Sequence, residues 1–273
     1  MKISVVIPTY KPQDYLWECL DSLIQQSFSR AHFEVIIVLN GCCEPWKERI
    51  DDYIRQNMSD MNVKFIQTDL GGVSNARNIA LDIAEGEYVT FIDDDDYVSS
   101  TFLQALYDLA RKDTIVISNV LAFKDGFKDD FIYYQLTDIY KKYSEHTELK
   151  ISSGVRKFFS GPCMKLISKD IIQDRRFDVR FRNGEDSLFM FMISDMVQHI
   201  KFASANAVYY RRYRVGSAMT SSRSSREIIR NNFKLIHEYT KIFFLTGRKY
   251  SFKLFITRIA AALRSISAGV KKV

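Results

Sequence analysis

Short apolar runs alternate with segments of helical spacing along the first 120 residues, and this alternation constrains the fold more than any other feature of the sequence. The runs are rich in β-branched residues, and the first two end at Pro8 and at Asn40-Gly41, as strands do. Between them, apolar residues recur every three or four positions, which is typical of helices. The sequence therefore predicts strands over residues 3–7, 33–39, 63–67, 88–92 and 114–120, with helices over 16–24, 45–57, 74–84 and 101–111.

Strands that alternate with helices form a mainly parallel, doubly wound sheet, and ligands bind at the carboxyl ends of its strands. We expect a Rossmann-like α/β domain over residues 1–220 and a basic amphipathic helical extension over residues 221–273. Residues 121–160 have no regular pattern. Two apolar stripes predict the helices of the extension, one at Ile229, Phe233, Ile236 and Phe243 and one at Phe252, Phe255, Ile256, Ile259, Leu263 and Ile266.

Composition narrows the setting of this fold. No run free of Asp, Glu, Lys and Arg exceeds eleven residues, which excludes a membrane-spanning helix of about 20 apolar residues. The four cysteines have neither the spacing of a metal site nor the density of a disulfide framework. A reducing, cytoplasmic setting is the simplest interpretation.

The net charge of +6 is distributed unevenly along the chain. Residues 201–273 hold 16 Lys and Arg against two acids, whereas residues 1–200 hold 23 Lys and Arg against 31 acids. An acidic body joined to a basic end is typical of a protein with two functional surfaces.

Four consecutive aspartates, Asp93 to Asp96, directly follow the fourth predicted strand. A solvated turn is one interpretation, since Asp favours turns, but one or two acids would suffice for it. Adjacent carboxylates repel each other, and a divalent cation would relieve that repulsion. Asp93 and Asp95 face the same side of an extended backbone, and their hard oxygen atoms suit Mg²⁺ or Mn²⁺, which also bind substrate phosphates. We therefore interpret the cluster as a metal site.

A second acidic pair, Glu185 and Asp186, begins a predicted helix after Gly184. Acids are favourable at helix N-termini, although capping explains one acid better than two. A carboxylate here can also act as a general base toward a hydroxyl nucleophile. The pattern alone leaves both interpretations open.

Aromatic and basic residues are mixed over residues 209–214. Nucleic acid, bound through phosphate contacts and base stacking, is one interpretation, a diphosphate held by arginines is another, and a solvated basic face is a third. The acidic body argues against a nucleic-acid partner, whereas a compact anion beside a carboxylate-bound cation fits both signs of charge. Arg77, which follows the pair Gly71-Gly72, is placed to reach back to the strand ends.

Together these segments resemble the inverting nucleotide-sugar glycosyltransferases of family 2, which have the A-type glycosyltransferase fold. The resemblance covers about residues 1–220, and its pieces occur in the family's order. The matching pieces are residues 4–10, 35–38 with Gly41, 76–78, 91–96, 165–166, 184–186 and 210–217.

The resemblance implies a role for each matching position. Asp93 and Asp95 match the metal motif, and Asp186, with Glu185 beside it, matches the catalytic base. The positions that match donor-binding residues are Pro8, Thr9, Tyr10, Asn40, Arg77, Asp94, Arg212 and Ser217.

The implied activity is Mn²⁺- or Mg²⁺-dependent, inverting transfer of a sugar from a nucleoside-diphosphate sugar to a hydroxyl of a glycan or lipid-linked acceptor, in bacterial surface polysaccharide synthesis. Asn40 stands where the family usually has an acid, which leaves the donor nucleotide open. No Gln-x-x-Arg-Trp motif follows Glu185-Asp186, which argues against a processive synthase. A sugar-phosphate nucleotidylyltransferase would need a Gly-rich basic loop at residues 8–12, and a non-catalytic binding module is the remaining alternative. The oligomeric state is not predicted.

The cations beyond the family motifs need a separate interpretation. With the apolar stripe at residues 252–266, they suggest a docking face for anionic lipid, as on a peripheral protein of the inner membrane face. A helix packed on the body with a solvated basic side is the alternative.

Overall fold

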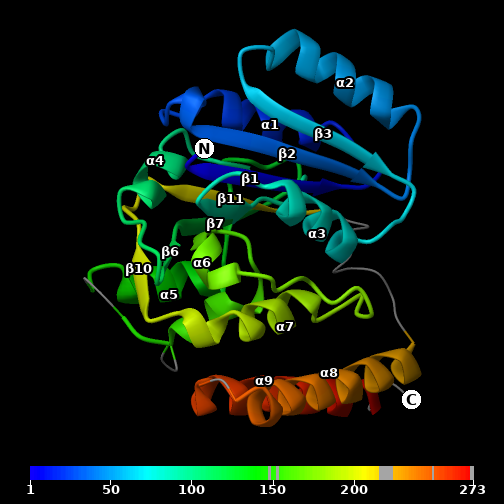
Figure 1. The fold of residues 1–273 in the computed structure, drawn as a ribbon, viewed down its shortest axis with the longest axis vertical. Coiled ribbons are helices and arrows are strands. Elements are labelled where there is room, and N and C mark those ends of the chain that lie inside the picture. Colours follow the sequence, from blue (N-terminus) through cyan, green and yellow to red (C-terminus); the bar gives the residue numbers. More distant parts are fainter. Residues whose placement is uncertain (147–148, 152–153, 215–223, 248, 271–273) are drawn as a thin grey trace.

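A seven-stranded sheet forms the centre of the computed structural model, which describes residues 1–146, 149–151, 154–214, 224–247 and 249–270 (Figure 1). The strand order is β10-β6-β9-β4-β1-β2-β3. All neighbours are parallel except β9, which is antiparallel to β4 and β6, so the mainly parallel sheet is confirmed. The strands are β1 (Ile3–Thr9), β2 (Phe33–Asn40), β3 (Asn62–Thr68), β4 (Tyr88–Phe91), β6 (Thr114–Ile117), β9 (Lys165–Ser168) and β10 (His199–Phe202).

The first four predicted strands and the four predicted helices are all present. Every residue of β1 and β2 is buried, because helices cover both faces of a parallel sheet and both sides of each strand must then be apolar or paired. The fourth helix is shorter than predicted and ends at Tyr107. The four helices are α1 (Tyr15–Ile24), α2 (Trp46–Asn57), α3 (Val73–Ile83) and α4 (Phe102–Tyr107).

The fifth predicted strand was wrong in one respect, because residues 114–120 belong to two strands in two sheets. The chain changes partners at Ser118, whose N–H donates to the Met164 carbonyl at 3.0 Å, and the next N–H donates to Ala207 at 2.9 Å. The residues on both sides of Ser118 are mainly apolar, so the periodicity of the sequence does not reveal where the chain passes from one sheet to the other. The second sheet has the order β5-β11-β7-β8, with β5 (Tyr97–Val98), β7 (Asn119–Lys124), β8 (Phe131–Ile132) and β11 (Val208–Tyr213).

Short elements fill the stretch that the sequence left unassigned, and helices dominate the C-terminal third. The described ranges also contain the short 3₁₀ helices η1 (Arg30–His32), which precedes β2, η2 (Val155–Ser160) and η3 (Ser194–Met196). The remaining α-helices are α5 (Gln135–Tyr143), α6 (Lys169–Ile172), α7 (Glu185–Met192), α8 (Ser225–Leu245) and α9 (Phe252–Val270).

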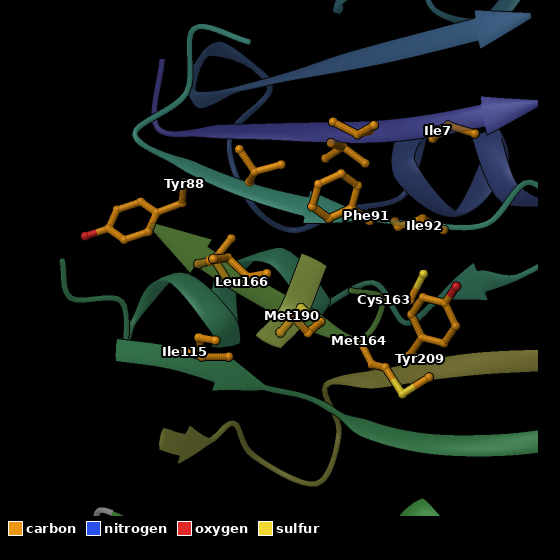
Figure 2. Packing of buried hydrophobic residues seen from close by; sticks show 14 of the residues in the cluster. Ile7, Tyr88, Phe91, Ile92, Ile115, Cys163, Met164, Leu166, Met190 and Tyr209 are labelled. Carbon is orange, nitrogen blue, oxygen red and sulfur yellow. The ribbon is translucent and has the colours of Figure 1, made fainter. Parts of the chain in front are cut away.

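Aromatic packing fixes α7 against the sheet. The rings of Phe177 and Phe189 are stacked with centroids 3.9 Å apart, and Phe91 of β4 meets both edge-on. Figure 2 shows Phe91, Leu166 of β9 and Met190 of α7 in the same buried cluster. The start of α7 is thereby held at a fixed place beside the end of β4.

The helices α8 and α9 form a hairpin that lies as a separate layer beyond α7 (Figure 1). The predicted helix is present as α8, but its apolar stripe is not the side that packs, since Phe233 is 58% exposed and the buried side chains are those of Asn232, Leu235, Tyr239 and Ile242. Apolar residues lie on more than one side of this helix, so periodicity alone does not identify the side that packs. Among the helices of the described ranges, none has the length and apolarity to cross a bilayer.

The apolar stripe predicted for α9 is likewise only partly buried. Phe255 is buried, but Phe252, Ile256 and Leu263 are exposed. The hydrophobic core continues into the hairpin through Leu235 and Phe255, and the domain boundary near residue 220 stays a prediction.

Candidate active site between the sheet edge and α7

The strand order reverses between β1 and β4, and the site lies at the carboxyl ends of these two strands. The strands β2 and β3 follow on one side of β1, whereas β4 lies on the other side, which makes this edge a topological switch point where α/β sheets bind ligands. Thr9 ends β1 and donates from Oγ1 to Asp94 Oδ2 at 2.5 Å. The structure therefore brings residues 4–10, the first segment that matches the family, next to the aspartate cluster.

Two of the four aspartates anchor the loop after β4. Asp96 is buried and accepts hydrogen bonds from the Tyr209 hydroxyl and the Arg212 backbone N–H, both at 2.7 Å. Burial, with the neighbouring Asp95 charge, raises the pKa of Asp94 to about 7, although the Thr9 hydroxyl opposes the shift. These bonds fix the backbone that presents the other two carboxylates.

Asp93 and Asp95 each pair with an arginine through one oxygen. Asp93 Oδ1 accepts from Arg77 Nη2 at 2.9 Å, and Asp95 Oδ2 accepts from Arg214 Nε at 2.6 Å. Burial and the repulsion of Asp93 raise the pKa of Asp95 despite Arg214. The arginines therefore neutralise only part of the negative charge on this loop.

Arg77 connects the two acidic sites that the sequence placed far apart. Its Nη1 donates to Asp186 Oδ1 at 2.5 Å while Nη2 holds Asp93. The side chain is buried; burial lowers the pKa of Arg77, but the charges of Asp186 and Asp93 outweigh burial and raise it. The predicted cation ligands and the predicted base thus lie on either side of one guanidinium.

Glu185 and Asp186 occupy the first turn of α7. The N-cap is Gly184, with φ +85°, which has no side chain to cap the helix, and both acids lie where the helix dipole favours negative charge. Burial raises the pKa of Asp186, against the opposing charge of Arg77. Burial and the Asp186 charge raise the pKa of Glu185 to about 7, and Glu185 Oε2 is buried without a hydrogen-bond partner.

Lys165 of β9 is a buried cation near Asp186 that sequence reasoning did not single out. Its Nζ donates to the carbonyls of Gly161 at 2.8 Å and Cys163 at 2.7 Å. Burial lowers the pKa of Lys165 to about 7, although the charges of Cys163 and Asp186 act in the opposite direction. Its presence in one of the matching family segments was the available signal.

Asn40, predicted to contact the donor base, joins two loops at the same edge. Its Nδ2 donates to the Thr9 carbonyl at 2.7 Å, and its Oδ1 accepts from the Gly72 N–H at 2.8 Å. One amide N–H is left for a base edge. The backbones of Gly41 and Gly71 pack closely against each other. A Cβ on Gly41 (φ +67°) would lie only 2.8 Å from Gly71 Cα, so this position has no room for a side chain.

Pro8 and Tyr10 flank Thr9 at this edge. Pro8 is buried within β1, whereas the Tyr10 side chain is 53% exposed. Tyr10 lies beside Gly41, whose Cβ would be 3.5 Å from the tyrosine ring. Tyr10 is thus the aromatic surface available for a base, and donor contacts by both residues stay predictions.

The Arg212 side chain is buried and makes its hydrogen bonds within the protein. Its side chain is 3% exposed and donates to Glu18 at 2.5 Å, to Asp125 at 2.7 Å and to the Asp95 carbonyl at 2.7 Å. Arg214 holds the Asp95 carboxylate instead, and a diphosphate contact by Arg212 stays a prediction. Ser217 lies outside the described residues.

A parallel sheet whose switch point joins an aspartate cluster, a buried arginine and a helix-borne acidic pair defines a glycosyltransferase of the A-type fold. The chain belongs to glycosyl transferase family 2, since the model of that family matches residues 4–176. This membership favours a sugar-transferring enzyme over the nucleotidylyltransferase and the non-catalytic module.

Two relatives show where the chain stands within the family. The poly(ribitol-phosphate) beta-N-acetylglucosaminyltransferase TarS of Staphylococcus aureus (strain MW2) is 28% identical over 244 residues, which cover 86% of this chain and 40% of TarS. Glycosyltransferase GlyG of Streptococcus pneumoniae serotype 4 is 30% identical over 228 residues, covering 80% of this chain and 72% of GlyG. The chain thus spans well under half the length of TarS.

Solved structures confirm the fold. The crystal structure of S. aureus TarS residues 1–349 in complex with UDP-GlcNAc has a TM-score of 0.74 at 24% identity, with 98% of this chain and 73% of that chain covered. Mannosyltransferase PcManGT from Pyrobaculum calidifontis, in complex with GDP-Man and Mn²⁺, has a TM-score of 0.65 at 17% identity, with 99% and 74% covered.

Proposed function

We propose that this glycosyltransferase moves a sugar, with inversion, from a UDP-sugar to a hydroxyl of a cell-surface polymer such as a polyol phosphate or another lipid-linked glycan. The observation that carries the proposal is the Arg77 bridge, which places the candidate cation ligand Asp93 and the candidate base Asp186 around one buried charge. The printed functions of the relatives, which include poly(ribitol-phosphate) glycosylation and minor teichoic acid biosynthesis, support this class of acceptor. The UDP-GlcNAc in the TarS complex supports a uridine donor.

The residues present suit a divalent cation shared with the donor diphosphate. Asp93 and Asp95 offer hard carboxylate oxygens, and burial together with mutual repulsion raises the pKa values of Asp94 and Asp95, so a nearby cation would stabilise their ionised forms. Among the described residues no three His, Cys, Asp or Glu side chains gather as a closed cage, so diphosphate oxygens and water would complete the shell. When bound, Mn²⁺ or Mg²⁺ would stabilise the charge of the departing nucleoside diphosphate.

The chain's own residues supply the base and its orientation. Asp186 accepts the acceptor hydroxyl proton as that oxygen forms a bond to the anomeric carbon, and the bonding electrons of the breaking bond leave with the diphosphate. In-line attack inverts the configuration. Burial raises the pKa of Asp186 and makes it a stronger base than an exposed aspartate, whereas Arg77 keeps it ionised and in place.

A transfer assay with a UDP-sugar, Mn²⁺ and a polyol-phosphate or lipid-linked acceptor tests the proposal. Asp186→Asn keeps the shape but removes the base, so we expect transfer to fall by about 10²–10⁴-fold while UDP binding persists. Asp51→Asn, an exposed aspartate on α2, is the matched control and should transfer at the wild-type rate. Undiminished turnover of Asp186→Asn would overturn the base assignment.

A further inference from the structure

The α8–α9 hairpin exposes large apolar side chains on the side that does not face α7. These residues are apolar, solvent-facing and distributed over both helices. Their exposed fractions are 58% for Phe233, 64% for Phe244, 76% for Leu245, 61% for Phe252, 45% for Ile256 and 52% for Leu263. We call this set the outer face of the hairpin.

The exposed apolar side chains share one side of each helix and come together near the hairpin turn. Phe233 and Phe244 are about three helical turns apart on the same side of α8, and Phe252, Ile256 and Leu263 repeat with the same period on α9. The two rows meet near the hairpin turn, where Phe244 lies 5.9 Å from the buried Phe255 and Phe252 lies 6.4 Å from the same ring, centroid to centroid. Contiguous exposed patches of this kind mark interaction sites.

Exposed cations accompany the outer face. Within residues 224–247 and 249–270 the acids are Glu227 and Glu238, and Glu238 pairs with Arg180 at 2.9 Å. The exposed cations of the same segments are Arg226, Arg230, Lys234, Lys241, Lys249, Lys253 and Arg264. The hairpin therefore offers an apolar surface with a strong positive charge.

We propose that the outer face docks on an anionic lipid bilayer surface, with the phenylalanines at the headgroup–acyl boundary and the cations against lipid phosphates. Helices with Phe and Leu beside Lys and Arg lie in the plane of such an interface. A second copy of the chain is a poorer partner, because two copies would bring the same positive charges together, whereas an anionic leaflet attracts each Lys and Arg.

The inner side of α8 connects this surface to the candidate base. Asn231 Nδ2 donates to the Asn183 carbonyl at 3.0 Å, and the hydroxyls of Tyr239 and Ser187 lie 2.7 Å apart. These contacts flank Glu185 and Asp186. Docking would therefore place the base about one helix diameter, roughly 10 Å, from the lipid surface, where a lipid-carried acceptor is presented. This consequence rests on the proposed function, whereas the docking itself does not.

Co-sedimentation of the full chain with vesicles tests the proposal. One set is phosphatidylcholine alone, and the other is phosphatidylcholine and phosphatidylglycerol in equal parts. We expect binding to the anionic set only. The triple charge reversal Lys241→Glu, Lys253→Glu and Arg264→Glu should weaken it by about 100-fold or more, since each cation near such a surface contributes several-fold. A matched reversal of three exposed lysines, at Lys112, Lys141 and Lys142, should weaken it much less.

The apolar part is tested separately. Phe233→Ser with Phe252→Ser should reduce anionic vesicle binding by at least about tenfold, because each substitution removes a phenyl ring that docking would bury in the bilayer interface. Phe127→Ser with Tyr133→Ser, whose side chains are 63% and 78% exposed outside the hairpin, should leave it unchanged. Absence of binding to anionic vesicles would overturn the proposal. So would sedimentation of the wild type as a dimer that Phe233→Ser dissociates, because the face would then join two copies.

Discussion

Arg77 holds the site together at the scale of single residues. It is buried, and its two terminal nitrogens pair with carboxylates that come from different halves of the chain. A buried carboxylate without a partner would bind a proton, so the guanidinium decides whether Asp186 is ionised. We expect Arg77 to position the base rather than to react, and its predicted contact with the donor stays a prediction.

Replacing Arg77 with Met should move the acidic limb of the kcat/KM profile to higher pH. The nearby positive charge holds the Asp186 pKa down against burial, and losing such a partner typically raises a carboxylate pKa by about 1–3 units. Initial rates across pH measure the shift. The exposed Arg55→Met should leave the limb in place, and an unmoved limb in Arg77→Met would contradict the assigned role.

Glu185→Gln should stabilise the protein above neutral pH. The pKa of Glu185 is raised from 4.5 to about 7 in the folded chain, so between these values the unfolded chain releases a proton that the folded chain retains. The free energy of unfolding therefore falls as pH rises through this range, and a glutamine at position 185, which does not ionise, removes this decrease. Urea unfolding at pH 5 and pH 8 measures it. Exposed Glu48→Gln should not change the pH dependence, and an equal slope in both variants would refute the expectation.

At the scale of elements, the start of α7 depends on α8. Gly184 adopts a left-handed conformation directly above Leu235, where an added Cβ would lie 2.5 Å from Leu235 Cδ1. The helix that carries Glu185 and Asp186 is thus seated on the hairpin that was predicted to be a separate extension. The active site and the C-terminal helices therefore share one packing contact.

Gly184→Ala should lower the free energy of unfolding by more than backbone strain alone. Left-handed backbone at a residue with a side chain costs about 1–3 kcal/mol, and the contact with Leu235 adds to it. Gly126→Ala is the matched control, because Gly126 has φ +82° but no atom within 4 Å of an added Cβ. Urea unfolding measures the decrease in the free energy of unfolding. An equal decrease in the two variants would show that the contact with Leu235 adds nothing to the cost of the substitution.

At the scale of the whole molecule, the uneven charge of the sequence becomes two opposed regions. The aspartates gather at the sheet edge, where a cation and a diphosphate would meet. The α8–α9 hairpin, which carries many of the cations, lies beyond α7 (Figure 1). The candidate base lies between them. Donor and acceptor would then approach from different sides of the molecule.

UDP with Mn²⁺ should stabilise the whole molecule, and removing the metal should cancel most of the effect. A ligand at 100 times its Kd adds about 2.7 kcal/mol to the free energy of unfolding. We expect thermal-shift measurements to rank UDP above other nucleoside diphosphates. EDTA in the wild type and Asp95→Ala with Mn²⁺ should reduce the UDP shift alike. A metal-dependent shift that survives in Asp95→Ala would contradict the cation site.

Local pattern was enough to predict the first four strands of the sheet, and with the family resemblance it singled out the candidate groups. Strands such as β1 and β2 are fully buried, so their apolar runs are visible without knowing their neighbours. Asp93 and Asp95 stand out because a turn needs fewer acids than four, whereas Asp186 was singled out only by the family resemblance. These features depend on residues close together in the chain.

Long-range partners were decided by the tertiary structure alone. Ser118 ends one strand because its neighbours change from β9 to β11. Asn232 rather than Phe233 faces inward because α9 lies on that side of α8, where Asn232 Nδ2 donates to Ser265 Oγ at 3.1 Å. Arg77 meets Asp186 through a contact that spans the domain. Such choices depend on which surfaces come together, and no local pattern records the partner of a side chain or of a helix face.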